Sequence, residues 1–523
     1  MTKGPPVRVV VIGAGIGGLV AALRLAHAGL AVTVLERAAA PGGKMRRVAV
    51  GDTAVEAGPT VFTMRWVLEE IFSECGADLS AHVGLEPAAI LARHAWGPGE
   101  ELDLLADPDA SEQAIADFAG LRERDGYRRF RARAAEVYAT LEAPFIRGER
   151  PSPLDLTRRA GFSGLGDLWR IQPFTTLWSA LGVYFADPRL RQLFGRYATY
   201  CGSSPFAAPA TLMLVAHVES EGVWHVAGGL SRLAGAVADL AARRGAAFRY
   251  GTQASGIAVE GGRVAGVDLA DGERIPADAV ICNADVAALA DGLLGREAAR
   301  AASPVPAAER SLSAVTHCVQ ARARGFPLAR HTVFFSGDYA AEFARIRSGR
   351  LPDDPTVYVC AQDRSDKDRG NEDRSDAAPD PQRPERLLCL VNAPAKPFGP
   401  SEIETCVSAM RRRLRASGLE LSDAAEPVTT QPEDFARLFP GSAGALYGRA
   451  SHGWMASFKR PGARTRIPGL YLAGGSVHPG PGVPMAAQSG RIAADSLLHD
   501  RSRARASTRG WTATATSGGT STP

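Results

Sequence analysis

Cysteine is scarce in this chain, and its arrangement excludes two kinds of small scaffold. The seven cysteines are an odd number, their spacing is scattered, and no Cys-x-x-Cys pair occurs. A disulfide framework or a zinc ribbon needs paired cysteines at short spacing. His, Asp and Glu residues show no paired spacing of that kind either. We therefore predict no metal site and no redox-active disulfide, and the cysteine usage favours a reducing compartment.

Long apolar runs are also lacking. The longest extends from Val9 to Leu23, and glycines interrupt it. A membrane-spanning helix needs about 20 apolar residues, so this run is too short. No small-residue cleavage site follows it, and a strand-like stretch at 31–35 comes next, which is not typical of a signal peptide. The sequence thus predicts neither a transmembrane helix nor a signal peptide, and any membrane contact is expected to be peripheral (monotopic).

A strong excess of one charge is missing as well. Lys and Arg number 60 against 56 Asp and Glu, which gives a net charge of +4. The basic surplus lies in residues 501–523, which contain several arginines and no acid, so the body of the chain is close to neutral. A nucleic-acid-binding domain presents a basic face, and no nucleic-acid partner is therefore expected.

A strand–turn–helix–strand unit begins the chain. Residues 7–12 are a short apolar run typical of a buried strand, residues 16–28 predict a helix, and residues 31–36 predict a second strand. Between the first strand and the helix lies Gly13-Ala14-Gly15-Ile16-Gly17-Gly18, a G-x-G-x-x-G pattern. Glu36 ends the second strand, 18 residues after the last of these glycines. This context indicates a dinucleotide-binding unit.

Each part of this motif has a physical role. Gly13 permits a tight turn, Gly15 lets the backbone approach a pyrophosphate, and Gly18 lets helix and strand pack closely. Free N–H groups at the helix N-terminus face the phosphates. Glu36 can accept hydrogen bonds from a ribose 2′-hydroxyl and would repel a 2′-phosphate, which disfavours NADP. The motif alone leaves NAD and FAD open, and a purely structural glycine turn is the other alternative.

Three further stretches favour a flavin. The double glycine of Pro41-Gly42-Gly43-Lys44 allows a backbone turn against a large cofactor, with Lys44 facing a phosphate or flavin oxygen. A plain turn with a solvated lysine is the alternative. Residues 56–60 form a tight turn that ends in the hydroxyl of Thr60, and residues 471–482 predict a strand followed by a glycine turn, before a helix at 485–498. A flavin dinucleotide is long enough to contact both glycine units.

The rest of the chain predicts a second region. Residues 100–225 have a mostly helical pattern, with apolar side chains at helical spacing between Tyr127 and Leu141. Residues 363–386 are polar and contain prolines, which predicts an exposed loop, and residues 501–523 predict a disordered tail. Short strand-like runs, two of them joined by a Gly261-Gly262 hairpin turn, occur at 248–250, 257–259, 264–269, 280–282, 356–360 and 387–392.

Together these motifs resemble the phytoene-desaturase-like carotenoid oxidoreductases, FAD-containing relatives of the amine oxidase superfamily. Within that family the chain is most similar to the 1-hydroxycarotenoid 3,4-desaturases, also called methoxyneurosporene dehydrogenases. The resemblance covers about Val7 to Leu498, without the insertion at 363–386 and the tail. Besides the glycine motifs it rests on six stretches: Ala57–Trp66, Arg93–Trp96, Val359–Asp363, Leu390–Pro394, Leu446–Trp454 and Gly475–Pro484.

The resemblance implies an α/β fold: a Rossmann-type FAD-binding domain of the glutathione-reductase/amine-oxidase type, with an inserted α+β substrate domain. The FAD-binding domain is expected to be discontinuous and the inserted domain to face substrate and membrane. Residues 1–95, 225–295 and 440–500 are expected to build the FAD-binding domain. Residues 96–224 and 296–439 are expected to build the substrate domain.

The family's FAD contacts can be carried over motif by motif. Many relatives place an acid after the glycine of the C-terminal motif to hold the ribityl chain, whereas this chain has Ser476 there. The residues that the resemblance assigns to FAD are Gly13, Ala14, Gly15, Gly17, Gly18, Glu36, Arg37, Gly43, Lys44, Pro59, Thr60, Ala254, Gly475, Ser476, Val483, Pro484 and Met485.

The resemblance also implies an activity: an FAD-dependent desaturase that introduces a C3–C4 double bond into acyclic 1-hydroxy or 1-methoxy carotenoids, such as hydroxyneurosporene. Hydride transfer to the flavin leaves a cation that the polyene delocalises, and proton loss from the next carbon completes the double bond. A weak base or water suffices for that proton, so no catalytic residue is required. No second G-x-G-x-x-G occurs, since Gly228-Gly229 and residues 441–444 do not fit. We therefore expect a quinone or oxygen as electron acceptor.

A long apolar substrate dissolves in membranes, so the resemblance implies a peripheral protein on the cytoplasmic side of a membrane. Phe162–Phe185 is rich in large apolar residues, and the predicted helix near 122–141 is flanked by arginines. Both are candidates for an interfacial surface. The alternative is that the first is ordinary core and the second a solvated helix.

Histidines and rival functions complete the predictions. His478 is a weak catalytic candidate because it lies in the flavin-proximal motif. Structural roles with satisfied hydrogen bonds are the usual alternative for histidines in a fold. The rival functions are a carotenoid desaturase or isomerase acting elsewhere on the polyene (phytoene type), a flavin amine oxidase, and a non-enzymatic flavoprotein or Rab-escort-like binding module. The five histidine candidates for substrate contact or proton acceptance are His94, His217, His225, His452 and His478.

Overall fold

The computed structural model describes residues 6–152, 174–364 and 383–515. One of its sheets is parallel and five-stranded, in the strand order β20-β13-β1-β2-β9. Side chains of β1 alternate between two apolar cores, Val9 and Val11 on one face and Val10 and Ile12 on the other. The strands are β1 (Arg8–Ile12), β2 (Ala31–Leu35), β9 (Ala247–Arg249), β13 (Ala279–Cys282) and β20 (Leu470–Leu472).

Helices cover one face of this sheet and a small antiparallel sheet covers the other. The helical layer consists of α1 (Ile16–His27), α2 (Arg65–Glu74), α9 (Leu230–Arg243) and α16 (Val483–Ala515). The opposite layer holds β10 (Ala254–Glu260), β11 (Arg263–Leu269), β12 (Arg274–Pro276), α10 (Val286–Ala290) and α11 (Arg296–Ala299). The predicted Gly261-Gly262 hairpin is confirmed, because it joins the antiparallel pair β10 and β11.

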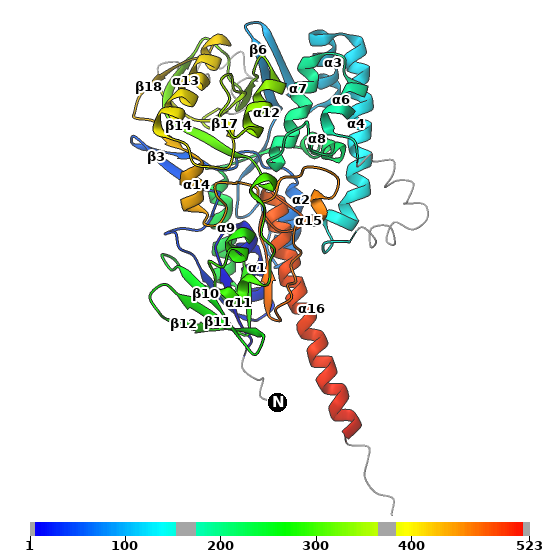
Figure 1. The fold of residues 1–523 in the computed structure, drawn as a ribbon. Helices are drawn as coiled ribbons and strands as arrows, with labels where there is room; N and C mark the ends of the chain where they lie inside the picture. The colour runs from blue at the N-terminus through cyan, green and yellow to red at the C-terminus, as the bar shows by residue number, and fades with distance from the viewer. Residues whose placement is uncertain (1–5, 153–173, 365–382, 516–523) are drawn as a thin grey trace, which may run out of the picture.

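A second, eight-stranded sheet lies above the first in Figure 1. Strand order is β18-β14-β17-β16-β15-β6-β7, with β19 paired to β14. Helix α13 (Pro400–Ala416) packs on one face through Cys406, Met410 and Leu414. The strands are β6 (Ile90–Gly97), β7 (Glu100–Leu105), β14 (Ser313–Arg324), β15 (His331–Phe334), β16 (Val357–Ala361), β17 (Glu385–Ala393), β18 (Glu420–Asp423) and β19 (Val428–Thr430).

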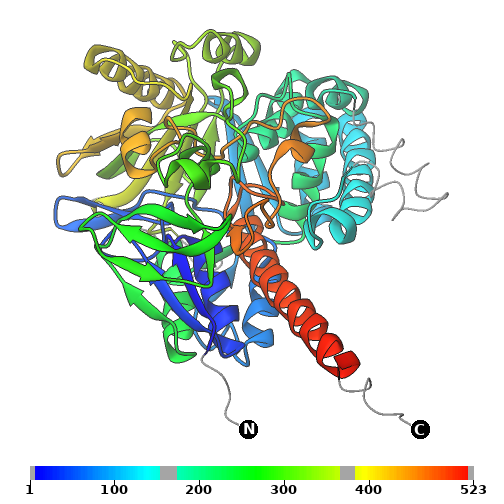
Figure 2. The same ribbon diagram turned by 60° about the horizontal axis from the view of Figure 1, so that its bottom comes forward.

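A helical lobe stands beside this sheet in both ribbon views (Figures 1 and 2). Tyr127, Phe130, Ala134 and Val137 of the predicted apolar stripe are buried in its core, as expected from their spacing. The lobe contains α3 (Pro108–Ala119), α4 (Leu121–Leu141), η1 (Glu142–Ile146), α6 (Leu177–Tyr184), α7 (Pro188–Gly195), η2 (Arg196–Cys201), η3 (Ala210–Met213) and α8 (Leu214–Ser220).

Short elements connect the three regions. Two strand pairs, β3 with β4 and β5 with β8, lie between the larger sheets along the chain. The remaining elements are β3 (Arg47–Val50), β4 (Thr53–Glu56), β5 (Leu85–Pro87), β8 (Trp224–Val226), η4 (Ala307–Glu309), α12 (Tyr339–Arg347), α14 (Pro432–Leu438) and α15 (Ala456–Lys459).

Three segment predictions need correction. The expected boundary at residue 95 falls inside β6, which pairs with β15 and so belongs to the eight-stranded sheet. The region predicted as mostly helical from residue 100 begins with strand β7. Residues 501–515, predicted to be disordered, continue α16, because extending an existing helix avoids the cost of nucleation.

The predicted polar loop at 363–386 is shorter than expected. Glu385 and Arg386 belong to β17. Arg364 bonds to Glu385 and Arg386 bonds to Asp363, so both ends are tied to the sheet. Residues 365–382 lie outside the described residues.

Candidate functional site

The two predicted glycine units meet at the carboxyl ends of the parallel strands. A Cβ added to Gly17 would lie 2.8 Å from the backbone nitrogen of Gly474, so the two turns are in direct contact. Asn283, which follows β13, donates from Nδ2 to the carbonyl of Gly13 at 3.3 Å. The carboxyl ends of parallel strands are where α/β folds bind their ligands. The topology therefore brings both units to one binding edge.

Close backbone packing explains the glycines of the helices. A Cβ on Gly18 would lie 2.1 Å from the carbonyl oxygen of Gly13. A Cβ on Gly490 would lie 2.0 Å from the carbonyl oxygen of Gly17, so α16 rests on the first turn of α1. Side chains at either position would separate the helices from the glycine turn.

Glu36 is held where the motif predicts an acid for a ribose. It is 8% exposed and directly follows β2. Its Oε2 accepts a hydrogen bond from the backbone N–H of Ala14 at 2.7 Å, and its Oε1 accepts one from Ala38 at 2.8 Å. Each carboxylate oxygen keeps a lone pair for a further donor. The carboxylate therefore fixes the glycine turn and also lines the cavity beside it.

The turn at 41–44 forms the other side of a backbone cradle. Gly42 donates to the carbonyl of Ala14 at 2.9 Å, and a Cβ on Gly43 would lie 3.2 Å from the Cα of Gly15. Gly43 has a φ of 59°, in the left-handed region that favours glycine. A Cβ at Gly43 would fill the space between the turns. This cradle fits the pyrophosphate of a dinucleotide.

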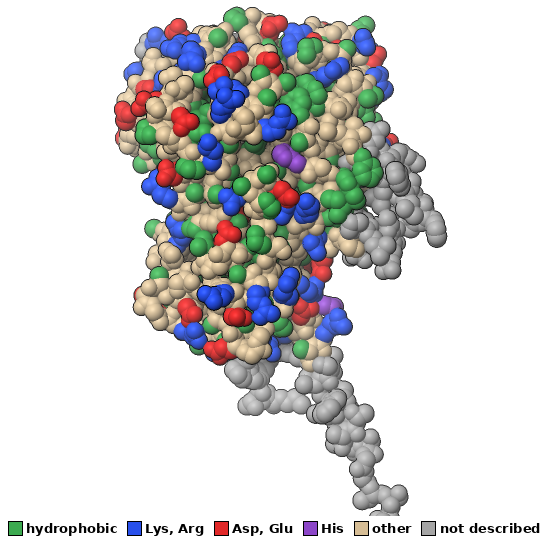
Figure 3. Space-filling model, viewed as in Figure 1, with side chains coloured by type: hydrophobic (Ala, Val, Ile, Leu, Met, Phe, Trp, Pro, Cys, Tyr) green, Lys and Arg blue, Asp and Glu red, His purple; other side chains and the backbone are tan. Residues whose placement is uncertain are grey.

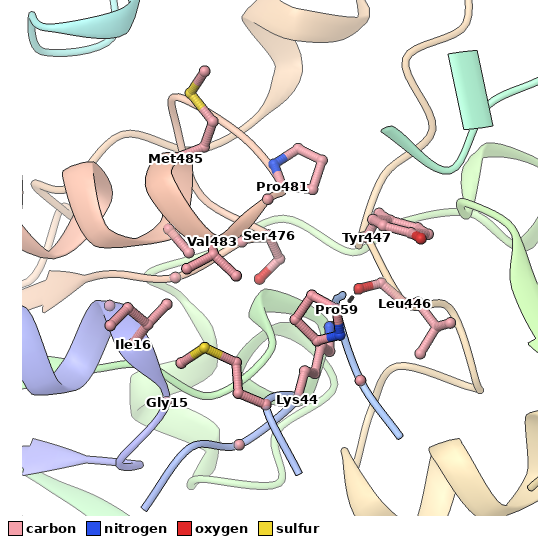
Figure 4. A pocket seen from close by; sticks show the side chains of 18 of the residues that line it. Gly15, Ile16, Lys44, Pro59, Leu446, Tyr447, Ser476, Pro481, Val483 and Met485 are labelled. Atoms are coloured by element: carbon pink, nitrogen blue, oxygen red, sulfur yellow. Dashed lines mark hydrogen bonds between the residues drawn. The ribbon is translucent and has the colours of Figure 1, made fainter. Parts of the chain in front are cut away.

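Lys44 extends into the middle of the cavity (Figure 4). Its Nζ donates to the carbonyl of Leu446 at 2.5 Å. Burial lowers the pKa of Lys44, and nearby Arg460 adds to the effect while Asp285 opposes it. Figure 4 shows Lys44 facing the same space as Pro59, Ser476 and Tyr447.

A single cavity of about 1830 Å³ joins these groups. Pockets for one drug-sized ligand are typically about 300–1,000 Å³, so this volume leaves room for a second long molecule beside a dinucleotide. Ala14 and Gly18 lie behind its wall. The predicted residues on the wall are Gly13, Gly15, Gly17, Glu36, Arg37, Gly43, Lys44, Pro59, Thr60, Ala254, Gly475, Ser476, Val483, Pro484 and Met485.

The structure adds wall residues that the sequence analysis missed. Asn283 and Asp285 follow β13 and line the cavity. The Oγ of Ser476 accepts a hydrogen bond from the N–H of Val286 at 3.1 Å, which places Asp285 beside the position where relatives carry an acid. The signal was available, because a predicted strand at 280–282 directly precedes these polar residues.

The far part of the cavity is mainly apolar. One wall is the inner face of the eight-stranded sheet, where Leu388, Leu390 and Asn392 alternate along β17 and Tyr358 pairs with Leu390. The opposite wall comes from the helical lobe. Its apolar lining includes Leu141, Phe145, Ile146, Leu212, Leu214, Val215 and Val218, and Phe458 of α15 lines the cavity as well.

None of the five predicted histidine candidates is on the cavity wall described here. His478 is 2% exposed, its Nε2 contacts the carbonyl of Gly148 at 3.1 Å, and burial lowers its pKa to about 4. His94 of β6 is buried and stacks on Phe335, which follows β15. His452 accepts from the N–H of Ser204 at 3.1 Å. The ring of His478 therefore contacts the 145–148 segment and is not on the cavity wall.

The described ranges hold neither a cluster of metal-binding side chains nor a membrane-spanning helix. Among those residues, no three or more His, Cys, Asp or Glu side chains gather closely enough to hold a metal ion. None of the helices in the same ranges is both long and apolar enough to cross a membrane.

The parallel sheet, the paired glycine turns and the covering eight-stranded sheet define an FAD-binding α/β oxidoreductase. The chain belongs to the family of flavin containing amine oxidoreductases, which matches residues 16–498. Two solved structures share the fold. An oxidoreductase from Methanosarcina mazei has a TM-score of 0.59 and 17% identity, and the match covers 94% of this chain and 100% of that one. A putrescine oxidase variant has a TM-score of 0.58 and 13% identity, and the match covers 95% of this chain and 100% of that one. The predicted fold class and cofactor are confirmed.

Relatives with higher identity are also known. A hydroxyneurosporene desaturase from Rubrivivax gelatinosus is 53% identical, over 94% of this chain and 93% of its own. A hydroxyneurosporene desaturase from Cereibacter sphaeroides is 46% identical, over 94% of this chain and 98% of its own. A phytoene dehydrogenase from Streptomyces griseus is 32% identical, over 95% and 96%.

Proposed function

We propose that the protein is an FAD-dependent desaturase that introduces the C3–C4 double bond into acyclic 1-hydroxy or 1-methoxy carotenoids. The main support is its identity of 44% to 53% to three hydroxyneurosporene desaturases over 94% of the chain. A flavin amine oxidase acts on a small polar substrate. The large apolar extension of the cavity favours a long apolar substrate instead.

Bound FAD supplies the hydride acceptor for such a reaction. The chain's own part is to hold the polyene between the sheet face of β17 and the helical lobe, with C3 and C4 near Lys44, Pro59 and Ser476. Apolar walls exclude water from this space, so orientation and desolvation carry the protein's contribution. No acid or base at the reacting carbons is required, since the polyene stabilises the cation that precedes proton loss.

Pigment analysis tests this proposal. We expect cells that co-express this chain with enzymes supplying 1-hydroxyneurosporene to accumulate a red-shifted carotenoid lighter by two hydrogens. The reason is that the new double bond extends the conjugated system. An unchanged pigment from cells containing the folded, flavin-loaded protein would contradict the substrate assignment.

We also propose a quinone or oxygen as the electron acceptor, because the sequence holds a single G-x-G-x-x-G. Anaerobic turnover supported by NAD(P)⁺ alone would overturn this part.

The membrane-facing surface is proposed at the outer end of the apolar cavity. Phe174 is 62% exposed, Trp454 is 42% exposed, their rings lie 5.2 Å apart, and both line the cavity. Figure 3 shows hydrophobic side chains gathered at this side of the molecule. Such a patch at a cavity mouth suits an apolar substrate that leaves a lipid phase.

Other parts of the predicted membrane surface do not support it. Trp178 is half-buried and packs on Phe206. On α4, Arg128 and Arg131 pair with Glu112, which neutralises much of the predicted basic face. Residues 162–173, including Trp169, lie outside the described residues.

Liposome sedimentation tests the patch. The double variant Phe174→Glu/Trp454→Glu is expected to lose most liposome binding, about a tenfold drop, because two charged groups replace two apolar anchors. Leu121→Glu serves as a control, since Leu121 is 61% exposed at the first residue of α4 and is not on the cavity wall. Equal binding by both folded variants and the wild type would reject this surface.

A further inference from the structure

A group of polar and charged side chains lies within the mainly apolar part of the cavity. Arg196 and Tyr200 come from η2, Glu219 from α8, Tyr358 from β16 and Thr60 from the loop after β4. We call these five residues the Arg196 cluster. All five line the cavity, next to Leu212, Val215, Val218 and Leu390.

Hydrogen bonds fix most of the cluster. Arg196 donates from Nη1 to the hydroxyl of Tyr200 at 3.1 Å, and Tyr200 donates to Oε1 of Glu219 at 3.1 Å. The other oxygen of Glu219 accepts from the hydroxyl of Tyr197. Glu219 is 4% exposed, so its carboxylate is committed to the two tyrosines. The carboxylate thereby anchors Tyr200, and Tyr200 orients the guanidinium of Arg196.

A second set of bonds connects the cluster to the predicted flavin side. Tyr358 places its hydroxyl 2.6 Å from Oγ1 of Thr60 and 2.7 Å from Nδ1 of His331. The guanidinium carbon of Arg196 lies 5.4 Å from the centre of the Tyr358 ring and 5.1 Å from that of Tyr200. Arg196 therefore sits between two aromatic rings, one of which is bonded to Thr60.

Arg196 keeps its charge in this setting. Burial disfavours the charged form, but interactions with Tyr200 and Glu219 outweigh it and raise the pKa of Arg196. Burial raises the pKa of Tyr200, so its hydroxyl keeps its proton. The cluster thus presents donors to the cavity at neutral pH.

The guanidinium has unused donors. It carries five N–H groups. Within the described ranges it makes one hydrogen bond, to Tyr200. A charged donor that loses water without gaining an acceptor costs about 1–3 kcal/mol or more. An apolar chain filling the cavity would impose that cost, and a ligand oxygen placed there would remove it.

We propose that the Arg196 cluster binds the oxygen on C1 of the substrate and thereby selects 1-oxygenated acyclic carotenoids. This inference rests on the proposed function and names the residue that determines specificity within it. Arg196 is assigned as the direct donor. Tyr200 and Glu219 act through Arg196 and are positioning residues.

The position of the cluster fits the chemistry. C3 is two carbons from the oxygen-bearing C1, so the group that binds the oxygen must lie close to the reacting bond. The 2.6 Å contact between Tyr358 and Thr60 places the cluster beside the loop that also carries Pro59. The polyene then extends from C4 along the apolar walls toward the cavity mouth.

The N–H donors of Arg196 also determine which substrates the site accepts. Hydroxyl and methoxy oxygens both have lone pairs and can accept from Arg196. Neurosporene, with no oxygen, would leave the guanidinium unpaired in an apolar site. Sites built to hydrogen-bond a substrate reject the analogue that lacks the group by large factors, of the order of 10⁴.

The test compares Arg196→Met with the wild type on two substrates. Methionine keeps much of the volume and removes every donor. For 1-hydroxyneurosporene we expect kcat/KM to fall at least about tenfold and Kd, measured by protein fluorescence quenching with the flavin held reduced, to rise by a similar factor. For neurosporene both values should stay within about threefold or improve. Arg133→Met is the matched control, because Arg133 is likewise a largely buried arginine and pairs with Glu136 away from the cavity wall.

Equal losses on the two substrates would overturn the inference while leaving the proposed function intact. A wild type that desaturates neither carotenoid would remove the proposed function and the inference with it. If Arg196→Met does not fold, kcat/KM values of the wild type on three substrates test the inference. Similar kcat/KM values for the 1-hydroxy and 1-methoxy substrates, at least about 100-fold above neurosporene, support the assignment. Equal values for neurosporene and its 1-hydroxy derivative overturn it.

Discussion

Gly18→Ala is expected to yield a protein that purifies without flavin. The added Cβ would lie 2.1 Å from the carbonyl oxygen of Gly13 and 3.1 Å from the side chain of Asn283. Backbone cannot yield as a flexible side chain does, so α1 must move away from the glycine turn. Overpacking of this kind costs about 1–3 kcal/mol, and misplacing the phosphate-facing N–H groups adds to the loss. We expect FAD affinity to fall about 100-fold.

The measurement is the flavin-to-protein absorbance ratio after purification, followed by FAD titration of the apoprotein. Gly182→Ala is the matched control, because its Cβ would meet nothing closer than 3.6 Å and Gly182 is likewise in a helix, α6. Circular dichroism separates cofactor loss from unfolding. A yellow Gly18→Ala protein with wild-type affinity would show that the glycine turn does not hold the cofactor.

Arg460→Met is expected to lower the free energy of unfolding by about 3 kcal/mol. Arg460 is 2% exposed and donates to the carbonyls of Tyr447 at 2.9 Å and Gly475 at 3.1 Å, and also to that of Arg449. Burial lowers its pKa to about 10, so it remains charged near neutral pH. Methionine would leave three carbonyls without their donor and release the second glycine turn from the 447–449 segment.

Thermal unfolding followed by flavin fluorescence measures this effect, since release of the turn should also free FAD at a lower temperature. Arg300→Met is the control, because Arg300 pairs with Glu297 on the surface of α11 and exposed pairs contribute about 0–1 kcal/mol. Matching melting temperatures for Arg460→Met and Arg300→Met would mean that Arg460 does not tie these segments together.

Local sequence patterns were enough to predict the dinucleotide-binding part of this site. The turn at 13–18 and the acid at Glu36 are close in sequence, and their contact follows from one strand–helix–strand unit. The second glycine unit lies far along the chain, but it repeats the same strand-and-turn pattern. Parallel pairing of β13 with both β1 and β20 then brings the units together.

The residues that line the apolar part of the cavity were harder to predict from the sequence. Strand β14 is buried on both faces, with Val315 and Val319 in one core and Cys318 in another, so it lacks a simple amphipathic alternation. The Arg196 cluster draws residues from η2, α8 and β16, and only tertiary packing makes them neighbours. A lone Arg, Tyr or Glu in a sequence carries no such signal.

The histidines also show that a sequence motif does not identify which side chains lie near the cavity. His478 sits within a motif, yet the structure turns its ring toward Phe145, with ring centres 4.6 Å apart. His331 belongs to no motif, yet its Nδ1 lies 2.7 Å from the Tyr358 hydroxyl beside the cavity. Position along the chain therefore did not reveal which histidine bonds to a residue of the cavity wall.

The most direct measurement is anaerobic mixing of the purified, FAD-loaded protein with 1-hydroxyneurosporene in detergent micelles. The account predicts that the oxidised flavin absorbance is lost and that one equivalent of a carotenoid lighter by two hydrogens, with the new double bond at C3–C4, is formed for each flavin reduced. Putrescine, run in parallel, should leave the flavin oxidised. Bleaching by the amine with none by the carotenoid would contradict the central claim and indicate an amine oxidase instead.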